Sequence, residues 1–203
     1  MIEEILTDIK SKLTQYLDDK SLVDPKISNA DTNVIMDNIA AFDLSNIAAP
    51  FTNSIVMSLV NVEEESTLKN TPFKRRNPVS NTVDYIDPPV HINLYLLFSV
   101  APDNTGSYYE KSLIKLSYII QFFQHRKRFN KSVDIDGEEH NIQLIFELYT
   151  LTFEQINHLW GSLGGKQIPF VMYKARLIEI QEQDSQPAAL IEEIENRVGH
   201  KNN

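Results

Sequence analysis

The chain has no cysteine among its 203 residues, which excludes disulfide bonds and thiolate metal sites. It has no apolar run long enough to cross a bilayer, and its acidic start, MIEEILTDIK, is unlike the basic head and apolar run of a signal peptide. The formal net charge is −9, which argues against general nucleic-acid binding because phosphate contacts need a surplus of lysine and arginine. We therefore expect a soluble protein with no membrane or nucleic-acid partner.

Glycine is also scarce, and three of the six glycines gather in WGSLGGKQ, residues 160–167. Such a cluster before a lysine raises the question of a phosphate-binding loop, which needs the spacing G-x-x-x-x-G-K-[ST]. Here Gly161 and Gly165 are one residue too close together, and Gln167 has no hydroxyl for a metal ion. A phosphate-binding loop also leaves a strand and opens a helix, so the flanking segments decide the interpretation.

The segments around these glycines run in the opposite order, from helix to strand. Thr152 and Gln155 have the spacing of a capping box, which starts a helix. The apolar residues of this helix fall three or four positions apart: Phe153, Ile156, Leu159 and Trp160. We therefore predict that Gly164 or Gly165 ends the helix with a positive φ. Trp160 is then a core residue, and the loop binds no cofactor.

The rest of the chain alternates helical and extended patterns. We predict helices at residues 1–18 and from Ser107 onward, and strands at 54–66, 88–100, about 169–181 and in a hairpin around Asp136-Gly137. This order, with its short connections, predicts an α+β domain with a single mixed, mostly antiparallel sheet covered by helices. The domain is expected to span residues 1–181, followed by an acidic tail, residues 182–203, that has the pattern of a short helix.

The helix that opens at Ser107 is predicted to be the main cover of the sheet. Ser107 and Glu110 form a second capping box. One apolar stripe follows at helical spacing: Tyr109, Leu113, Leu116, Ile120 and Phe123, broadened by Ile119 and Phe122. We expect this stripe to face the core.

No pattern in the chain predicts catalysis. The five histidines (His91, His125, His140, His158 and His200) are not spaced as helical metal ligands. The acidic segment DIDGEEH is shorter than a calcium loop of about twelve residues, so a solvated turn is the better interpretation. No G-x-S-x-G marks a serine nucleophile. The sequence therefore predicts no catalytic residue, no cofactor and no metal site.

Two basic clusters remain. Arg126-Lys127-Arg128 follows the main helix, where cations complement the helix dipole. Lys74, Arg75 and Arg76 lie in a segment with loop composition, so two interpretations stay open: steering onto an acidic partner or an ordinary solvated loop. In the last strand, Lys174, Arg176 and Glu179 are the kind of residue that protects an edge strand. We therefore expect residues 171–180 to form an edge that contacts a partner.

Several of these segments together resemble one protein family. PPVHINLYLLFSV, YYEKSLIKLSYIIQFFQHRKRFN and LTFEQINHLWGSLGGKQIPFVMYKARLIEI resemble the cap, or tail-terminator, proteins of extracellular contractile injection systems of the antifeeding-prophage type. The start MIEEILTDIKSKLTQYL and the strand NSIVMSLVNVEEES fit the same family in order, so the resemblance covers residues 1–181. The family usually has serine where Phe170 or Val171 stands, a departure that concerns packing.

The resemblance implies a structural role. It implies a homo-hexameric ring on the end of the inner tube and sheath, which ends tube growth and holds the last sheath ring. The protein would then be made in the bacterial cytoplasm and become part of a cytoplasmic or released particle. Two alternatives stay open: a neck or head-tail completion protein of a contractile phage tail, and an enzyme that binds a nucleotide or another small ligand.

Overall fold

The computed structural model describes residues 1–41, 53–65, 74–76, 83–85, 91–101, 108–135, 137–165 and 167–180. The α-helices are α1 (Ile2–Ser21), α2 (Tyr108–His125) and α3 (Phe153–Ser162). The strands are β1 (Val34–Met36), β2 (Ile55–Glu64), β3 (Lys74–Arg76), β4 (Val83–Tyr85), β5 (Ile92–Val100), β6 (Arg128–Ile135), β7 (Glu138–Leu148) and β8 (Phe170–Ile180). Two 3₁₀ turns, Asn29–Asp31 and Ile39–Ala41, flank β1. No helix of these ranges is both long and apolar enough to span a membrane.

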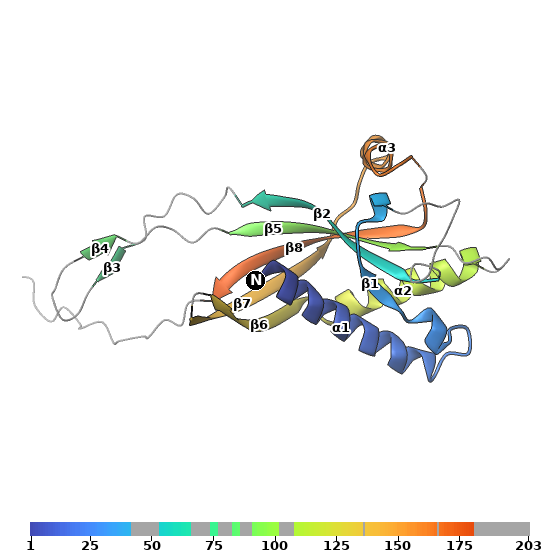
Figure 1. Cartoon of the computed structure of the whole chain (residues 1–203), viewed down its shortest axis with the longest axis horizontal. Coiled ribbons are helices and arrows are strands. Elements are labelled where there is room, and N and C mark those ends of the chain that lie inside the picture. The colour runs from blue at the N-terminus through green and yellow to red at the C-terminus, as the bar shows by residue number, and fades with distance from the viewer. Residues whose placement is uncertain are drawn as a thin grey trace, which may run out of the picture.

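Six of the strands form one curved sheet in the order β1-β2-β5-β8-β7-β6 (Figure 1). β1 runs parallel to β2, and every other pair is antiparallel. The predicted α+β fold with a mixed, mostly antiparallel sheet is thus confirmed. β3 and β4 form a separate two-stranded sheet. The segment around Lys74–Arg76, predicted as an extended loop or an excursion from the sheet, is thus an excursion that contains a short strand pair.

β8 lies inside the sheet, and the prediction of an edge strand at residues 171–180 was wrong. Its residues pair with β5 on one side and with β7 on the other; Arg176, for example, lies opposite both Asn93 and Ile145. The outer strands are β1 and β6. Charged residues alone do not mark an edge, because a strand that is paired on both sides still presents alternate side chains to solvent.

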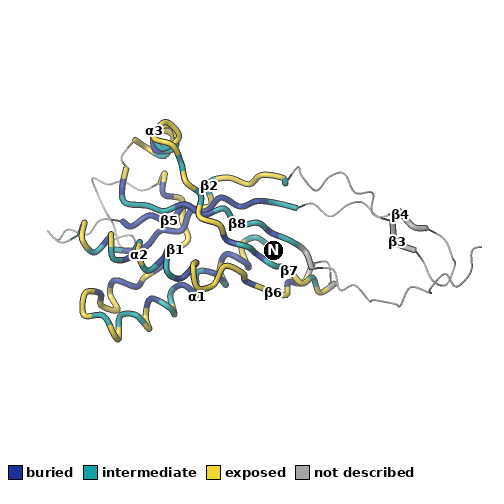
Figure 2. The backbone as a smooth tube through the Cα atoms, turned by 180° about the vertical axis from the view of Figure 1, so that it is seen from behind, coloured by how far each residue is buried: buried dark blue, intermediate teal, exposed yellow. Residues whose placement is uncertain are grey.

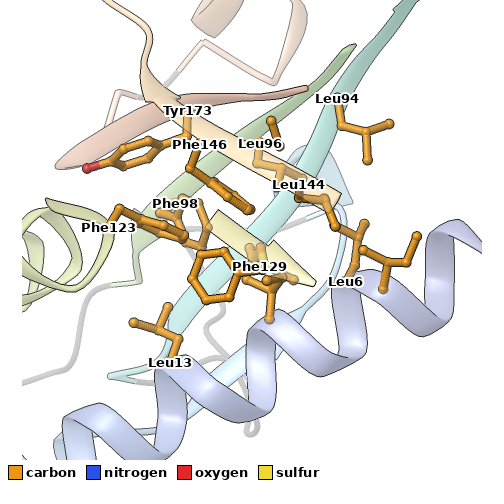
Figure 3. Close-up of a cluster of buried hydrophobic side chains, with 14 of the residues drawn as sticks. Leu6, Leu13, Leu94, Leu96, Phe98, Phe123, Phe129, Leu144, Phe146 and Tyr173 are labelled. Carbon is orange, nitrogen blue, oxygen red and sulfur yellow. The ribbon is translucent and has the colours of Figure 1, made fainter. Parts of the chain in front are cut away.

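The main core lies between one face of the sheet and the helices α1 and α2. One face of α1 is buried there, through Ile5, Leu6, Ile9, Leu13 and Leu17, which confirms the predicted N-terminal helix. Figure 2 shows the buried side of α1 turned toward the strands and its outer side exposed. Aromatic side chains from α2, β5, β6, β7 and β8 fill the centre (Figure 3): Phe123, Phe98, Phe129, Phe146 and Tyr173.

α2 is rotated relative to its predicted orientation. Its buried residues are Ser112, Lys115, Ile119, Phe122 and Phe123. Two residues of the predicted core stripe, Tyr109 and Leu113, are exposed instead. The prediction used apolar periodicity alone. The observed buried face of α2 is different because it includes Lys115. Ser107, the predicted cap, lies outside the described residues.

The opposite face of the sheet is covered over part of its area by α3. A second, smaller cluster forms there from residues of β2, β5, β8 and α3: Val56, Tyr95, Leu97, Met172, Trp160 and their neighbours. Phe153, which was predicted on the apolar side of α3, is 93% exposed. It stands at the first helical position, where the chain has just left the sheet. Beyond α3 this face of the sheet carries polar and charged side chains.

Candidate functional site

The structure brings Lys174 and Arg176 into a charged cluster on the sheet face that α3 leaves uncovered. Lys174 Nζ lies 3.7 Å from Glu65 Oε2, and Arg176 Nε lies 3.9 Å from the same oxygen. The Arg176 guanidinium also lies 3.7 Å from Glu147 Oε2. Two strands, β7 and β8, and the residue that follows β2 thus place two cations between two carboxylates. The charges neutralise one another, so the cluster offers no free base or nucleophile.

A tyrosine–carboxylate pair lies next to this cluster. The Tyr95 hydroxyl donates a hydrogen bond to Glu63 Oε2 at 2.5 Å. That hydrogen bond, with burial, raises the pKa of Tyr95 to about 12. The phenol therefore stays protonated at neutral pH, which suits a structural hydrogen bond and not an activated nucleophile.

A buried lysine, which sequence reasoning missed, links three segments on the other side of the sheet. Lys115 of α2 is 1% exposed. Its ammonium group donates to the backbone oxygen of Asn53 at 2.6 Å and to Asn53 Oδ1 at 2.7 Å, and lies 3.8 Å from Asp31 Oδ1. Asn53 has a φ of 60° and donates from Nδ2 to Asp31 Oδ1 at 2.7 Å. The lysine thereby holds α2 to the turn before β1 and to the residues that lead into β2.

Asp31 is the counter-charge of this network. Burial by itself raises the pKa of its carboxyl, but hydrogen bonds from Asn53 and Ser28, with the Lys115 charge, outweigh burial and hold the pKa well below its usual range. A carboxyl whose folded pKa is lowered stabilises the fold above the unfolded pKa, and that stabilisation is lost as the pH falls through the folded value. The network therefore stabilises the fold at neutral pH.

The glycine loop has the geometry of a helix end. Trp160 is 4% exposed and packs edge-on against Phe170, with ring centroids 5.4 Å apart. Gly164 and Gly165 have φ values of 104° and 80°, and the Gly165 N–H donates to the Trp160 carbonyl at 2.7 Å. This is the long hydrogen bond of a glycine-terminated helix. The loop follows α3 and leads into β8, so it lacks the strand-to-helix order of a phosphate site. Lys166 lies outside the described residues.

Two glycines of this loop give a matched test of that geometry. Gly164→Ala is expected to lower the free energy of unfolding by about 1–2 kcal/mol, because an L-residue is strained at positive φ. Gly161 is helical, and an added Cβ meets nothing within 4 Å at either glycine. Gly161→Ala should therefore raise stability by roughly 0.5–1 kcal/mol. Urea unfolding of both variants checks the pair, and equal shifts of the same sign would contradict the cap.

The other predicted residues are dispersed. His91 precedes β5, and His125, His140 and His158 lie on α2, β7 and α3. The described part of the chain contains no group of side chains that could hold a metal ion. His200 and Asp136 are outside it. Gly137, with a φ of 87°, forms the predicted hairpin turn between β6 and β7. Glu179 lies opposite Ile142 near the end of β8.

Comparisons with known proteins identify the family of this chain. The family model of the Pvc16 N-terminal domain matches residues 4–193. The chain belongs to this family. A search of curated proteins gives no match. The family assignment confirms the resemblance read from the five sequence segments.

Two solved structures share the fold. One is the sheath/tube terminator, in the extended state, of the extracellular contractile injection system PVC, with a TM-score of 0.53 and 11% identity over 100% of this chain. The other is the tube-terminating cap of the anti-feeding prophage, with a TM-score of 0.51 and 12% identity over 98% of this chain. The chain spans 65% and 62% of the length of these two proteins. At these identities the likeness establishes the fold.

Proposed function

We propose that the chain is a structural cap, or tail terminator, of an extracellular contractile injection system. The observation that carries this proposal is the combination of family membership with a fold that matches two terminator structures over almost the whole chain. The charged cluster on the sheet supports it, because its ion pairs are closed on themselves and do not form a catalytic site. The chain then acts by assembly and not by catalysis.

The partners follow from this role. The cap contacts the last ring of inner tube protein and the last ring of sheath protein, and six copies form the ring. Such a chain is made in the bacterial cytoplasm and becomes part of an extracellular particle. Because the chain covers only about two thirds of the two terminators, its contacts are argued from its own residues.

Assembly of tubes in the presence of the protein tests the role. Tube protein polymerised alone is expected to give a broad length distribution, and adding the cap should stop growth and label one end of each tube in electron micrographs. A heat-unfolded sample of the same protein is the control. Unchanged tube lengths with no density at tube ends would refute the cap role.

We place the contact with the tube or sheath rim at Lys74, Arg75 and Arg76. These residues form β3, which pairs with β4 in a sheet separate from the main one. Three consecutive cations in a chain of net charge −9 form a local positive site. Long-range attraction to an acidic rim would speed docking and fall with salt.

Reversal of these charges gives the test. Lys74→Glu/Arg75→Glu/Arg76→Glu is expected to slow association with tube ends by about tenfold or more at low salt, with a smaller effect at high salt. The thermal midpoint should stay within a few degrees of the parent. Lys10→Glu/Lys20→Glu/Lys26→Glu changes the net charge equally and serves as control. If the two variants associate at the same rate, β3 is not the steering site.

A further inference from the structure

An apolar stripe on α2 is left uncovered by the described chain. Tyr109 is 62% exposed and Leu113 is 46% exposed, and the stripe continues through the partly exposed Leu116 and Ile120. The stripe exists because the Lys115 side of α2 faces the core. Exposed apolar side chains that follow one helix face over three turns are typical of an interface.

The stripe leads into a groove. A hollow of about 380 Å³ lies between the second half of α2 and the ends of β7 and β8. Its apolar walls are Ile120, Phe123, Ile145, Phe146, Leu148 and Tyr173, and its polar rim is Gln124, Lys127 and Glu147. Leu148, at the mouth, is 55% exposed. Ile120 belongs to both features, so stripe and groove form one continuous surface.

The groove contains a hydroxyl donor. The Tyr173 ring is buried, and its hydroxyl, which makes no hydrogen bond to a described residue, is open to solvent at the groove. Figure 3 shows this hydroxyl pointing away from the aromatic cluster. Burial raises the pKa of Tyr173 to about 12, so the phenol carries its proton at neutral pH. This hydroxyl can donate a hydrogen bond to solvent or to a carboxylate that binds at the groove.

The sequence after β8 has the complementary pattern. Between Pro187 and Gly199, apolar residues fall on one side of a helix at Leu190, Ile191, Ile194 and Val198. Proline at the start and glycine after the end are the usual boundaries of a helix. The interleaved residues Glu192, Glu193 and Glu195 supply carboxylates. An amphipathic acidic helix of this kind fits an apolar stripe with a lysine and a phenol at its end.

We propose that residues 188–198 of a second copy of this chain bind as a helix along the α2 stripe, with the groove at Tyr173 at one end. The proposal deepens the ring of the proposed function, on which it rests, because it names the contact that joins neighbouring copies.

The reach of the chain assigns the tail to a neighbour. Ile180 lies seven positions beyond Tyr173 on β8, or about 23 Å at 3.3 Å per residue. From Ile180 to residue 188 the chain makes eight residue steps, which span at most about 29 Å when fully extended. A chain that folded back onto its own groove would have only a few Å left to pass around the end of the sheet. A neighbouring copy has no such constraint.

The absence of native cysteine makes a cross-linking test direct. One chain carries Leu113→Cys, and a second, size-tagged chain carries Ile191→Cys. Mixing the two at high concentration under mild oxidation is expected to give the mixed disulfide about tenfold faster than a control pair, because docking raises the local thiol concentration. The control replaces Leu113→Cys with Glu154→Cys, which lies on the exposed surface of α3.

Each outcome of this experiment decides the proposal. Equal rates for the two pairs would overturn it. The double variant Leu113→Cys/Ile191→Cys at high dilution gives the second decision: a cross-linked monomer would show that the tail binds its own chain and would overturn the assignment to a neighbour. The cap role is tested separately by tube length, so a failure of tail exchange with normal capping removes only this inference.

A pair of surface variants checks the stripe itself. Tyr109→Ser/Leu113→Ser should lower the cross-linking rate of Ile120→Cys with the tail variant to the control level. Leu22→Ser/Phe153→Ser removes comparable exposed apolar area elsewhere and should leave the rate unchanged. Equal effects of the two pairs would overturn the proposal.

Discussion

Lys115→Met is expected to lower the free energy of unfolding by about 3–5 kcal/mol, the range for removing one partner of a buried ion pair. Methionine keeps the length of the apolar stem, with sulfur in place of one methylene, and removes the ammonium group. The variant leaves two acceptors of the partly buried Asn53 without their donor and Asp31 without its nearest buried cation. Thermal unfolding followed by circular dichroism measures the effect, at roughly 2–4 °C per kcal/mol for a chain of this length.

Lys111 supplies the matched control on the same helix. Its Nζ lies 3.6 Å from the same Asp31 oxygen, but its side chain is 32% exposed. An exposed ion pair contributes about 0–1 kcal/mol, so Lys111→Met should be nearly silent. If Lys115→Met is as mild as Lys111→Met, the buried network is not what holds α2 to the start of β2.

Local patterns gave most of the secondary structure. The α3 capping box is present, with Gln155 N–H donating to the Thr152 hydroxyl oxygen, and the hairpin turn at Gly137 lies where Asp136-Gly137 predicts it. β2 and β5 also lie within the predicted ranges. Each of these features depends on residues a few positions apart, so single-sequence reasoning reaches them.

The order of the strands in the sheet could not be predicted from the sequence, for a physical reason. Whether β8 is an edge depends on β5 and β7, which approach it from distant parts of the sequence. The pattern of charges on Lys174 and Arg176 looked like edge protection, but it reflects cross-strand pairing with Glu65 and Glu147. The sequence of a strand indicates which of its side chains face solvent. It does not indicate whether its backbone is hydrogen-bonded on one side or on both.

The prediction of which face of α2 is buried was wrong for the same reason. Lys115 is buried only because Asn53, 62 positions away, brings two acceptors to it. The surrounding sequence, SLIKLSYII, contains one feature that points to this burial: a lone lysine in an apolar run. Such a lysine is as consistent with a buried hydrogen-bonding partner as with a solvent-exposed helix face. The sequence alone does not show where that partner lies.

Phe123→Ala is expected to cost about 3–5 kcal/mol, the range for truncating a buried phenylalanine. The Phe123 ring stacks on Phe146 at a centroid distance of 4.5 Å and lies 4.5 Å from the ring of Tyr173. It also contacts the rings of Phe98, Phe122 and Phe129. Because these rings come from α2 and four different strands, the loss cannot be absorbed by moving one element.

Phe153→Ala is the matched control for this truncation. It removes the same atoms from a side chain that is 93% exposed, so its effect should stay within about 0.5 kcal/mol. Chemical denaturation of both variants measures the difference. If Phe123→Ala lowers the free energy of unfolding by less than about 1 kcal/mol, the core collapses into the space left by the ring. The aromatic cluster would then only fill space and would not fix α2 to the sheet. Since Phe123 also forms a wall of the groove, that result would make the groove deformable and remove the rigid surface that tail docking requires.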